Sequence, residues 1–229
     1  TSLIEGSVFK SVVPISSPQN SNYTTIKNSA FTEPMVYAKS HKINLDNCEF
    51  DQRDENDLDN PTYSGLEVED ASYVGIQITD FIDNLEYAVY LNDCEDIDID
   101  KLHIGSDYAT SYTAQAPYTK NGIIFIECRD MDMDESTIKS TETGIQFYAD
   151  QRYSLSSSIS TCSFVDSKYG IVIAPEINPW TNGNSTIINE NTHKINLDLP
   201  CNQFFGAEYA ISGSGYLNDQ GTSTLGASN

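Results

Sequence analysis

Residues 88–100, Ala-Val-Tyr-Leu-Asn-Asp-Cys-Glu-Asp-Ile-Asp-Ile-Asp, are nearly repeated at residues 122–134, Gly-Ile-Ile-Phe-Ile-Glu-Cys-Arg-Asp-Met-Asp-Met-Asp. Cys94 aligns with Cys128, and each copy ends in strict alternation of aspartate with an apolar residue. Such alternation is typical of a strand with one buried and one solvated face. Two equivalent strands in one chain indicate a repeat architecture.

The same pattern extends outward from this pair. A shift of 23 residues lays 88–104 onto 65–81, and a further shift of 31 aligns Met35, Tyr37, Ser40 and Ile43 with the same columns. One apolar column runs through most of the chain at spacings of 19 to 34 residues, and it consists of Phe9, Phe31, Phe50, Phe81, Ile104, Ile138 and Phe164. The shortest unit therefore has about 20 residues, with loops inserted in the longer ones.

Units this short cannot bury their own apolar faces, but stacked units can. The sequence therefore predicts an all-β fold, a parallel β-helix of about 7–8 turns in one domain over residues 1–229, with 175–229 less regular. The phenylalanine and isoleucine column becomes an internal ladder of stacked side chains. Small residues in a second column suit a tight inward corner: Ser40, Ala71, Cys94 and Cys128.

This pattern resembles the right-handed parallel β-helix repeat proteins, which include polysaccharide lyases and hydrolases, phage tailspikes and non-catalytic modules of bacterial surface proteins. The segment Gly215-Tyr-Leu-Asn-Asp-Gln-Gly221 and the turns rich in Asn, Ile, Lys and Asp are similar to large surface proteins of Bacteroidota. Those proteins are exported by type 9 secretion with a separate sorting domain. The resemblance implies an excerpt of a longer secreted chain, with a secretion machinery and neighbouring domains of the same chain as partners.

The composition narrows the choice of partners. The net charge of −22 excludes nucleic acid, whose phosphates need Lys and Arg, and repels anionic polysaccharides unless metal ions bridge them. Neutral glycans, protein surfaces and divalent cations remain compatible. No run of about 18 apolar residues is present, so no membrane span is predicted, and an extracellular or cell-surface location is expected. The five cysteines share similar contexts, which favours recurring buried positions over a disulfide framework.

Inserted loops are the first place to expect a binding site. Residues 51–64 follow Phe50 and residues 105–121 follow Ile104, so both insertions should leave the same edge of the stack. Residues 175–185 follow another strand of a later turn. Amphipathic aromatic residues suit glycan or protein surfaces, and the candidates are Tyr63, Tyr87, Tyr108, Tyr112, Tyr118 and Trp180. The alternative is that these side chains pack the loops onto the scaffold.

The first of these loops is also a candidate calcium site. Calcium takes six to eight oxygen ligands, which carboxylates on a flexible loop can supply, and the candidates here are Asp51, Asp54, Asp57 and Asp59. Their spacing does not match the EF-hand pattern. The alternative is a solvated charged loop, and calcium is the one cofactor that the sequence suggests.

The repeated aspartates are the candidate catalytic groups. With Ile97 and Met131 inward, the carboxylates of neighbouring strands should point outward about 4.8 Å apart, and they are Asp98, Asp100, Asp132 and Asp134. Solvent and salt could screen these charges, cations could bridge them, or two of them could serve as acid and base. A glycosidase needs carboxyls at about 5–5.5 or 6.5–9.5 Å, which an array can meet by accident.

The signatures that the resemblance would imply for enzymes of this fold are not present. The sequence lacks the Asp-Asp, Gly-His-Gly and Arg-x-Lys motifs of polygalacturonase-like members. We therefore expect a non-catalytic secreted or cell-surface module that acts as a stalk or in adhesion, with glycan or protein binding by its edge loops. The alternatives are a polysaccharide-active lyase, hydrolase or phage tailspike of the same fold, and a calcium-dependent adhesin.

Overall fold

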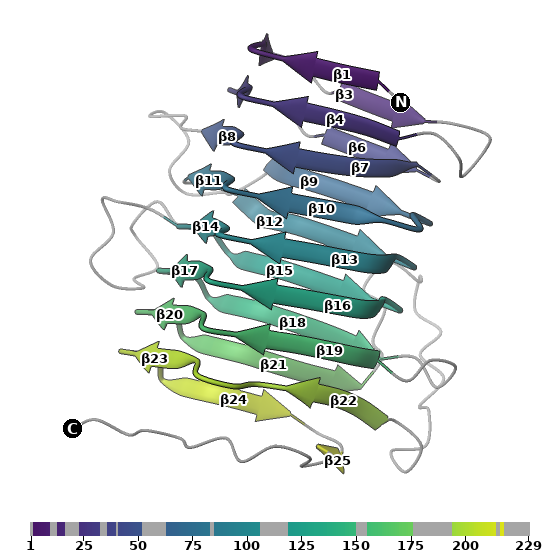
Figure 1. The fold of residues 1–229 in the computed structure, drawn as a ribbon. Coiled ribbons are helices and arrows are strands. Elements are labelled where there is room, and N and C mark those ends of the chain that lie inside the picture. The colour runs from purple at the N-terminus through teal and green to yellow at the C-terminus, as the bar shows by residue number, and fades with distance from the viewer. Residues whose placement is uncertain are drawn as a thin grey trace, which may run out of the picture.

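A computed structural model describes residues 2–9, 13–16, 23–32, 36–39, 41–51, 63–82, 85–105, 119–149, 155–175, 194–213 and 216–217. Over these ranges the protein contains strands and turns and no helix. The strands form three sheets, and all strand pairs are parallel. Figure 1 shows them stacked from the N-terminal turn to the C-terminal turn. No helix in the described ranges is long and apolar enough to cross a membrane.

Each turn of the chain contributes one strand to each sheet in the same order. The first strands of the turns form sheet A, which consists of β1 (Ser2–Glu5), β4 (Tyr23–Lys27), β7 (Lys42–Asp46), β10 (Val74–Gln77), β13 (Glu95–Asp100), β16 (Arg129–Asp134), β19 (Leu155–Ser160), β22 (Lys194–Asp198) and β25 (Tyr216–Leu217). The second strands form sheet B, which consists of β2 (Val8–Phe9), β5 (Ala30–Phe31), β8 (Glu49–Asp51), β11 (Asp80–Ile82), β14 (His103–Ile104), β17 (Thr137–Lys139), β20 (Ser163–Val165) and β23 (Gln203–Phe205).

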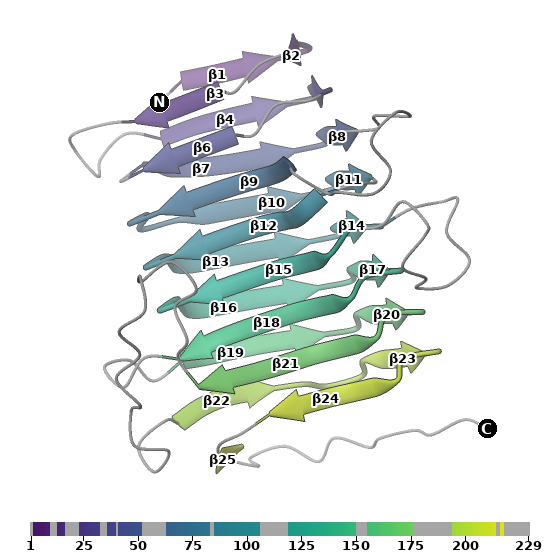
Figure 2. The ribbon, with the colours of Figure 1, turned by 180° about the vertical axis from the view of Figure 1, so that it is seen from behind.

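Sheet C lies behind sheet A in Figure 1 and faces the viewer in Figure 2. It consists of β3 (Val13–Ser16), β6 (Val36–Lys39), β9 (Tyr63–Glu69), β12 (Leu85–Asn92), β15 (Asn121–Ile126), β18 (Thr143–Ala149), β21 (Tyr169–Pro175) and β24 (Tyr209–Gly213). The described strands thus complete eight turns and begin a ninth. Each strand pairs only with its equivalents in the turns before and after, an arrangement consistent with a parallel β-helix.

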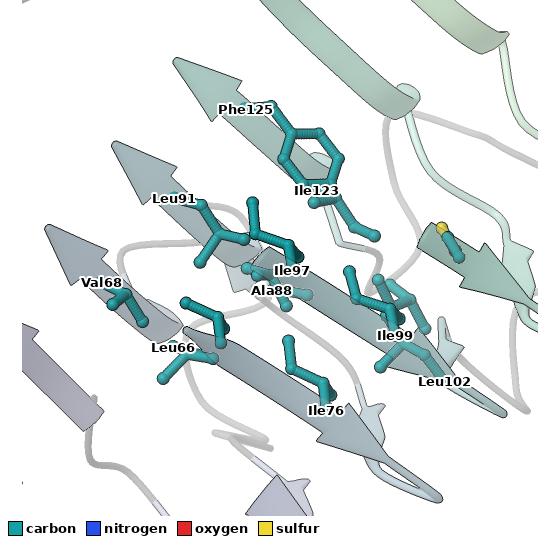
Figure 3. Close-up of a cluster of buried hydrophobic side chains, with 14 of the residues drawn as sticks. Leu66, Val68, Ile76, Ala88, Leu91, Ile97, Ile99, Leu102, Ile123 and Phe125 are labelled. Carbon is teal, nitrogen blue, oxygen red and sulfur yellow. The ribbon is translucent and has the colours of Figure 1, made fainter. Parts of the chain in front are cut away.

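The core lies between the three sheets. Alternate residues of each strand point inward, and Figure 3 shows side chains of sheet C, such as Leu66 and Leu91, meeting side chains of sheet A, such as Ile76 and Ile97. The register of sheet A confirms the alignment of the two near-copies, because Ile97 pairs with Met131 and Ile99 with Met133. The apolar half of the repeated segment therefore belongs to the core.

The predicted ladder of phenylalanine and isoleucine residues is confirmed in sheet B. Phe9, Phe31, Phe50 and Phe81 pair in successive turns, with ring centroids 4.3 to 4.8 Å apart and nearly parallel planes. The column continues through Ile104, Ile138 and Phe164. It also reaches Phe204, which stacks on Phe164 at 4.9 Å. The spacing of 40 residues between Phe164 and Phe204 (204 minus 164) exceeds the 19 to 34 of the other members, which hid this last member from the spacing pattern.

The corner between sheets A and B explains the recurring small polar residues. The residue two positions before each sheet B strand has a positive φ, as at Asn28 (49°) and Asn47 (54°), where asparagine tolerates the left-handed conformation. The next residue turns inward and donates its hydroxyl or thiol to the carbonyl oxygen two residues earlier, in the same way at Ser29, Cys48, Thr79, Ser136 and Cys162. A short polar side chain therefore satisfies a corner carbonyl in turn after turn.

The cysteines occupy two corners and not one. Cys48 and Cys162 lie between sheets A and B, whereas Cys94 and Cys128 lie between sheets C and A, in the buried column of Ala71. The expectation that all five are buried was wrong for Cys201, which is exposed. Cys201 occupies the positive-φ position that Asn28 and Asn47 hold in earlier turns, and that position points to solvent.

The expected inward position of Tyr37 was also wrong. In β6 it is Val36 and Ala38 that pair with the inward Leu66 and Val68, so Tyr37 points outward. A shift of 30 residues aligns β6 with β9, whereas a shift of 31 aligns β7 with β10. The difference of one residue falls at the corner between β6 and β7, and a slip of one residue moves every side chain of a strand to its other face. Met35 and Ser40 lie outside the described residues.

Candidate functional site

The repeated aspartates lie in two ranks on the outer face of sheet A. Asp98 pairs with Asp132, and Asp100 pairs with Asp134, across β13 and β16. The residues that alternate with them are buried, namely Ile97 and Ile99 on one strand and Met131 and Met133 on the other. The four carboxylates therefore point outward. The structure thus brings together the four residues that the sequence put forward as candidate acid and base.

The surroundings of Asp134 favour a charged, hydrogen-bonded carboxylate. The Thr161 and Ser160 hydroxyls donate to Asp134, the latter at 2.9 Å, and these two bonds are the main reason that the pKa of Asp134 lies below its ordinary value. Lys101 Nζ lies 2.9 Å from Asp100. A general acid needs a pKa raised toward neutrality, and the surroundings of Asp134 act in the opposite direction.

The predicted calcium loop is only partly described. Asp51 ends β8, and Asp54, Asp57 and Asp59 lie outside the described residues. Within the described ranges, no group of three or more His, Cys, Asp or Glu residues could hold a metal ion. The calcium site therefore stays a prediction.

The predicted aromatic residues divide in the same way. Tyr63 begins β9 and Tyr87 lies in β12, whereas Tyr108, Tyr112, Tyr118 and Trp180 lie outside the described residues. The insertions after Asp51 and Gly105 do start at the same corner, because Phe50, Phe81 and Ile104 are in register in sheet B. The third insertion starts at a different corner, after Pro175 at the end of β21 in sheet C.

A larger gathering of aromatic and acidic residues lies on the outer face of sheet C. Five consecutive strands, β6, β9, β12, β15 and β18, place their outward side chains in two columns. We call these side chains, together with Tyr87, the sheet C face: Tyr37, Glu67, Tyr90, Ile124 and Gln146 in one column, and Lys39, Glu69, Asn92, Ile126 and Tyr148 in the other.

Hydrogen bonds between neighbouring turns hold the polar side chains of this face. The Tyr87 hydroxyl donates to Glu67 Oε2 at 2.8 Å, and the Tyr37 hydroxyl donates to Glu69 Oε2 at 3.1 Å. Lys39 Nζ donates to the same Glu69 oxygen at 2.8 Å. Among the described residues, the two carboxylates therefore have different partners, a phenol for Glu67 and a phenol with an ammonium group for Glu69.

The centre of the sheet C face is apolar. Tyr90, Ile124 and Ile126 are only 8%, 9% and 6% exposed, and they form a hydrophobic cluster separate from the core, with Tyr87 and Tyr148 packed against it. The rings of Tyr87 and Tyr90 lie 5.2 Å apart at an angle of 40°. The half-buried rings of Tyr87 and Tyr148 are therefore supported by a buried apolar cluster.

Burial shapes the electrostatics of the face. It raises the pKa of Glu67 above its ordinary value, with the neighbouring charge of Glu69 adding to the effect and the Tyr87 bond opposing it. Burial also raises the pKa of Tyr87, and it raises that of Tyr90 to about 12. Both phenols therefore remain hydrogen-bond donors at physiological pH.

No protein-family model matches this sequence, and no curated protein does. The likeness to Bacteroidota surface proteins therefore remains a resemblance of a few residues. The evidence for a site lies in the side chains themselves.

The sequence singled out only one member of the sheet C face, Tyr87. The others were missed because their alignment depends on the register of sheet C, and because the shift of 31 residues had aligned Tyr37 with the buried Val68 and not with Glu67. One signal was available, because Glu67, Tyr90 and Ile124 alternate with buried residues of three aligned segments and so share an outward column. The bonding partners of Glu67 and Glu69 lie 20 and 32 residues away along the chain, which no local motif captures.

Proposed function

We propose that this protein is a right-handed parallel β-helix module, secreted or held at the cell surface, whose sheet C face binds a glycan without acidic groups. The handedness follows from the general rule that connections between parallel strands of one sheet are right-handed in about 98% of cases. The stack of equivalent turns supplies a long, rigid surface, which is the usual basis for recognition by solenoids.

The observation that carries the proposal is the composition of the sheet C face. Tyr87 and Tyr148 are half-buried, so each leaves part of its side chain at the surface. Tyrosine rings pack against the apolar faces of sugars, and carboxylate oxygens such as those of Glu67 accept hydrogen bonds from sugar hydroxyls. The face crosses five turns, which suits an extended ligand better than a single small molecule.

The charge of the protein selects among glycans. With a net charge of −22, the protein repels polyanions, including sulfated and uronic-acid-rich polysaccharides. Glu67 and Glu69 sharpen this selection on the sheet C face itself. A neutral or positively charged glycan meets no such barrier.

The setting of the module follows from the same proposal. A glycan-binding solenoid suits an extracellular or cell-surface location, where it would serve as a stalk or in adhesion. The resemblance to Bacteroidota surface proteins adds type 9 secretion and neighbouring domains of the same chain as proposed partners. A secreted form recovered from the culture medium of the source cells would support this setting, and a strictly internal location would contradict it.

A glycan array is the direct test of the binding function. We expect binding to neutral or amine-bearing glycans and none to sulfated ones. Tyr87→Ala should raise the dissociation constant about tenfold, because the variant loses roughly one aromatic contact with the glycan. Tyr209→Ala is the matched control, because Tyr209 is an exposed sheet C tyrosine outside the sheet C face. No binding to any glycan, or equal affinities for the two variants, would overturn the proposal.

A further inference from the structure

Glu67 sits among three tyrosines. Tyr37 precedes it and Tyr90 follows it in the same outward column of sheet C, each on a directly paired strand about 4.8 Å away. The hydroxyl of the third, Tyr87, donates to Glu67 Oε2 at 2.8 Å. The carboxylate is thus flanked by aromatic residues from the turn before it and from the turn after it.

This carboxylate has no positive partner among the described residues. Lys39, the cation of the sheet C face, is bound to Glu69 at 2.8 Å and lies 3.9 Å from Asp70. The described ion pairs do not include Glu67, and the charge that acts on it most strongly is the negative one of Glu69. A half-buried carboxylate without a cation is costly, and a ligand that supplies one removes that cost.

The surrounding rings favour a cation of a particular kind. The faces of aromatic rings carry negative potential and attract ammonium groups, with typical distances up to about 6 Å from the ring centroid. Tyr37 and Tyr87 are half-buried, whereas Tyr90 is only 8% exposed and supports Tyr87, whose ring lies 5.2 Å away. An ammonium group that forms a hydrogen bond to Glu67 would lie beside the accessible parts of Tyr37 and Tyr87.

We propose that Glu67, with Tyr37 and Tyr87, binds the ammonium group of an amino sugar. This inference rests on the proposed function, since it names the glycan class that the sheet C face selects. The ligand is a glycan whose sugars carry free amino groups. The charge of the whole protein acts in the same direction, because a net charge of −22 attracts a positively charged polymer.

A metal ion fits these residues less well than an ammonium group. Calcium takes six to eight oxygen ligands, and magnesium requires an octahedral set. The site offers one carboxylate with one of its oxygens already bonded to a phenol, and two half-buried rings. An ammonium group needs only one to three acceptors and gains from the rings.

The test compares two probes that differ only in the amine. Oligomers of β-1,4-linked glucosamine and their N-acetylated counterparts of equal length are titrated into the protein by calorimetry at fixed salt. We expect the free amine to bind about tenfold more tightly. Glu67→Gln, which keeps the size and removes the charge, should abolish this preference. Asp132→Asn removes one charge from sheet A and should keep it, which separates a local effect from the overall charge.

Each outcome has a distinct reading. Equal affinities for the two probes, both weakened by Tyr87→Ala, would overturn the ammonium site and leave the glycan-binding function standing. If both Glu67→Gln and Asp132→Asn keep the preference for the free amine, the preference comes from the overall negative charge of the protein. That result would also overturn the ammonium site. No binding of either probe would overturn the ammonium site, whereas the glycan-binding function is decided separately by the glycan array. Unfolding midpoints of the variants confirm that each one is folded.

Discussion

The Tyr87 hydroxyl donates a 2.8 Å hydrogen bond to Glu67 across the paired strands β12 and β9. This bond favours the charged carboxylate, yet burial outweighs it and raises the pKa of Glu67. The folded state therefore holds the Glu67 proton more tightly than the unfolded state does. The stability linked to this proton is fully present below the ordinary glutamate pKa and is lost as the pH rises through the raised one.

This linkage gives a prediction for Glu67→Gln. A glutamine keeps the acceptor for Tyr87 and removes the buried charge, so the variant should be more stable than the natural protein at pH 7, by at most about 1 kcal/mol. At pH 4 the difference should disappear. Urea unfolding at the two pH values measures both. Glu69→Gln is the control. It should lower the free energy of unfolding at pH 7, because it weakens the contacts of Glu69 with Lys39 and Tyr37.

Phe50 is the central ring of the ladder in sheet B. Its ring lies 4.3 Å from that of Phe31 and 4.4 Å from that of Phe81, and it is fully buried. We expect Phe50→Ala to lower the free energy of unfolding by about 3–5 kcal/mol, since the change removes a core side chain and leaves a cavity. Phe205→Ala, at a ring that is 48% exposed, should cost well under 1 kcal/mol. Equal losses in denaturant unfolding would contradict the inward position of the ladder.

Ile78 is strained at the corner between sheets A and B. Its φ of 47° lies in the left-handed region, which a β-branched residue adopts only at a cost, and its side chain is 52% exposed. Asn47 holds the equivalent position one turn earlier. Ile78→Asn should therefore raise the free energy of unfolding by about 1 kcal/mol. The reverse exchange, Asn47→Ile, should lower it, and a stability loss in both variants would refute the strain argument.

The five cysteines should react in two classes. Burial raises the pKa of the Cys48, Cys128 and Cys162 thiols, in the case of Cys162 to about 11, whereas Cys201 is exposed. Because the thiolate is the reactive form, a colorimetric thiol reagent at pH 8 should modify one cysteine quickly and the other four only on unfolding. In Cys201→Ser the fast phase should vanish. A fast phase that remains would show that a second thiol is accessible.

The fold could be predicted from the sequence where the residues that recur from turn to turn point into the core. Phe31, Phe50 and Phe81 are large side chains, each fully buried at the equivalent position of its own turn. This recurrence can be recognised in the sequence despite the inserted loops. Recognition fails where an insertion is long, as before Phe204. It also fails where a corner gains or loses a residue, as between β6 and β7, because the shift moves Tyr37 from one face to the other.

The candidate site was harder to predict for a physical reason. Outward positions tolerate many residue types, so no single column of the sheet C face repeats one type, and Tyr37, Glu67 and Tyr90 succeed one another. What joins them is contact between turns, which the sequence shows only after the register is known. The aspartates of sheet A stood out for the opposite reason, as identical residues in equivalent places, although Ser160 and Thr161 already satisfy Asp134.

The pairing of each turn with only its two neighbours also determines how the protein should bear tension. A force applied to the two ends of the chain loads the hydrogen bonds of the terminal turn first, and the interior turns carry load only after that turn has peeled away. In optical tweezers we expect a series of small extensions, each releasing the contour length of a turn or two. One abrupt rupture of the whole stack would instead mean that the turns behave as a single mechanical unit.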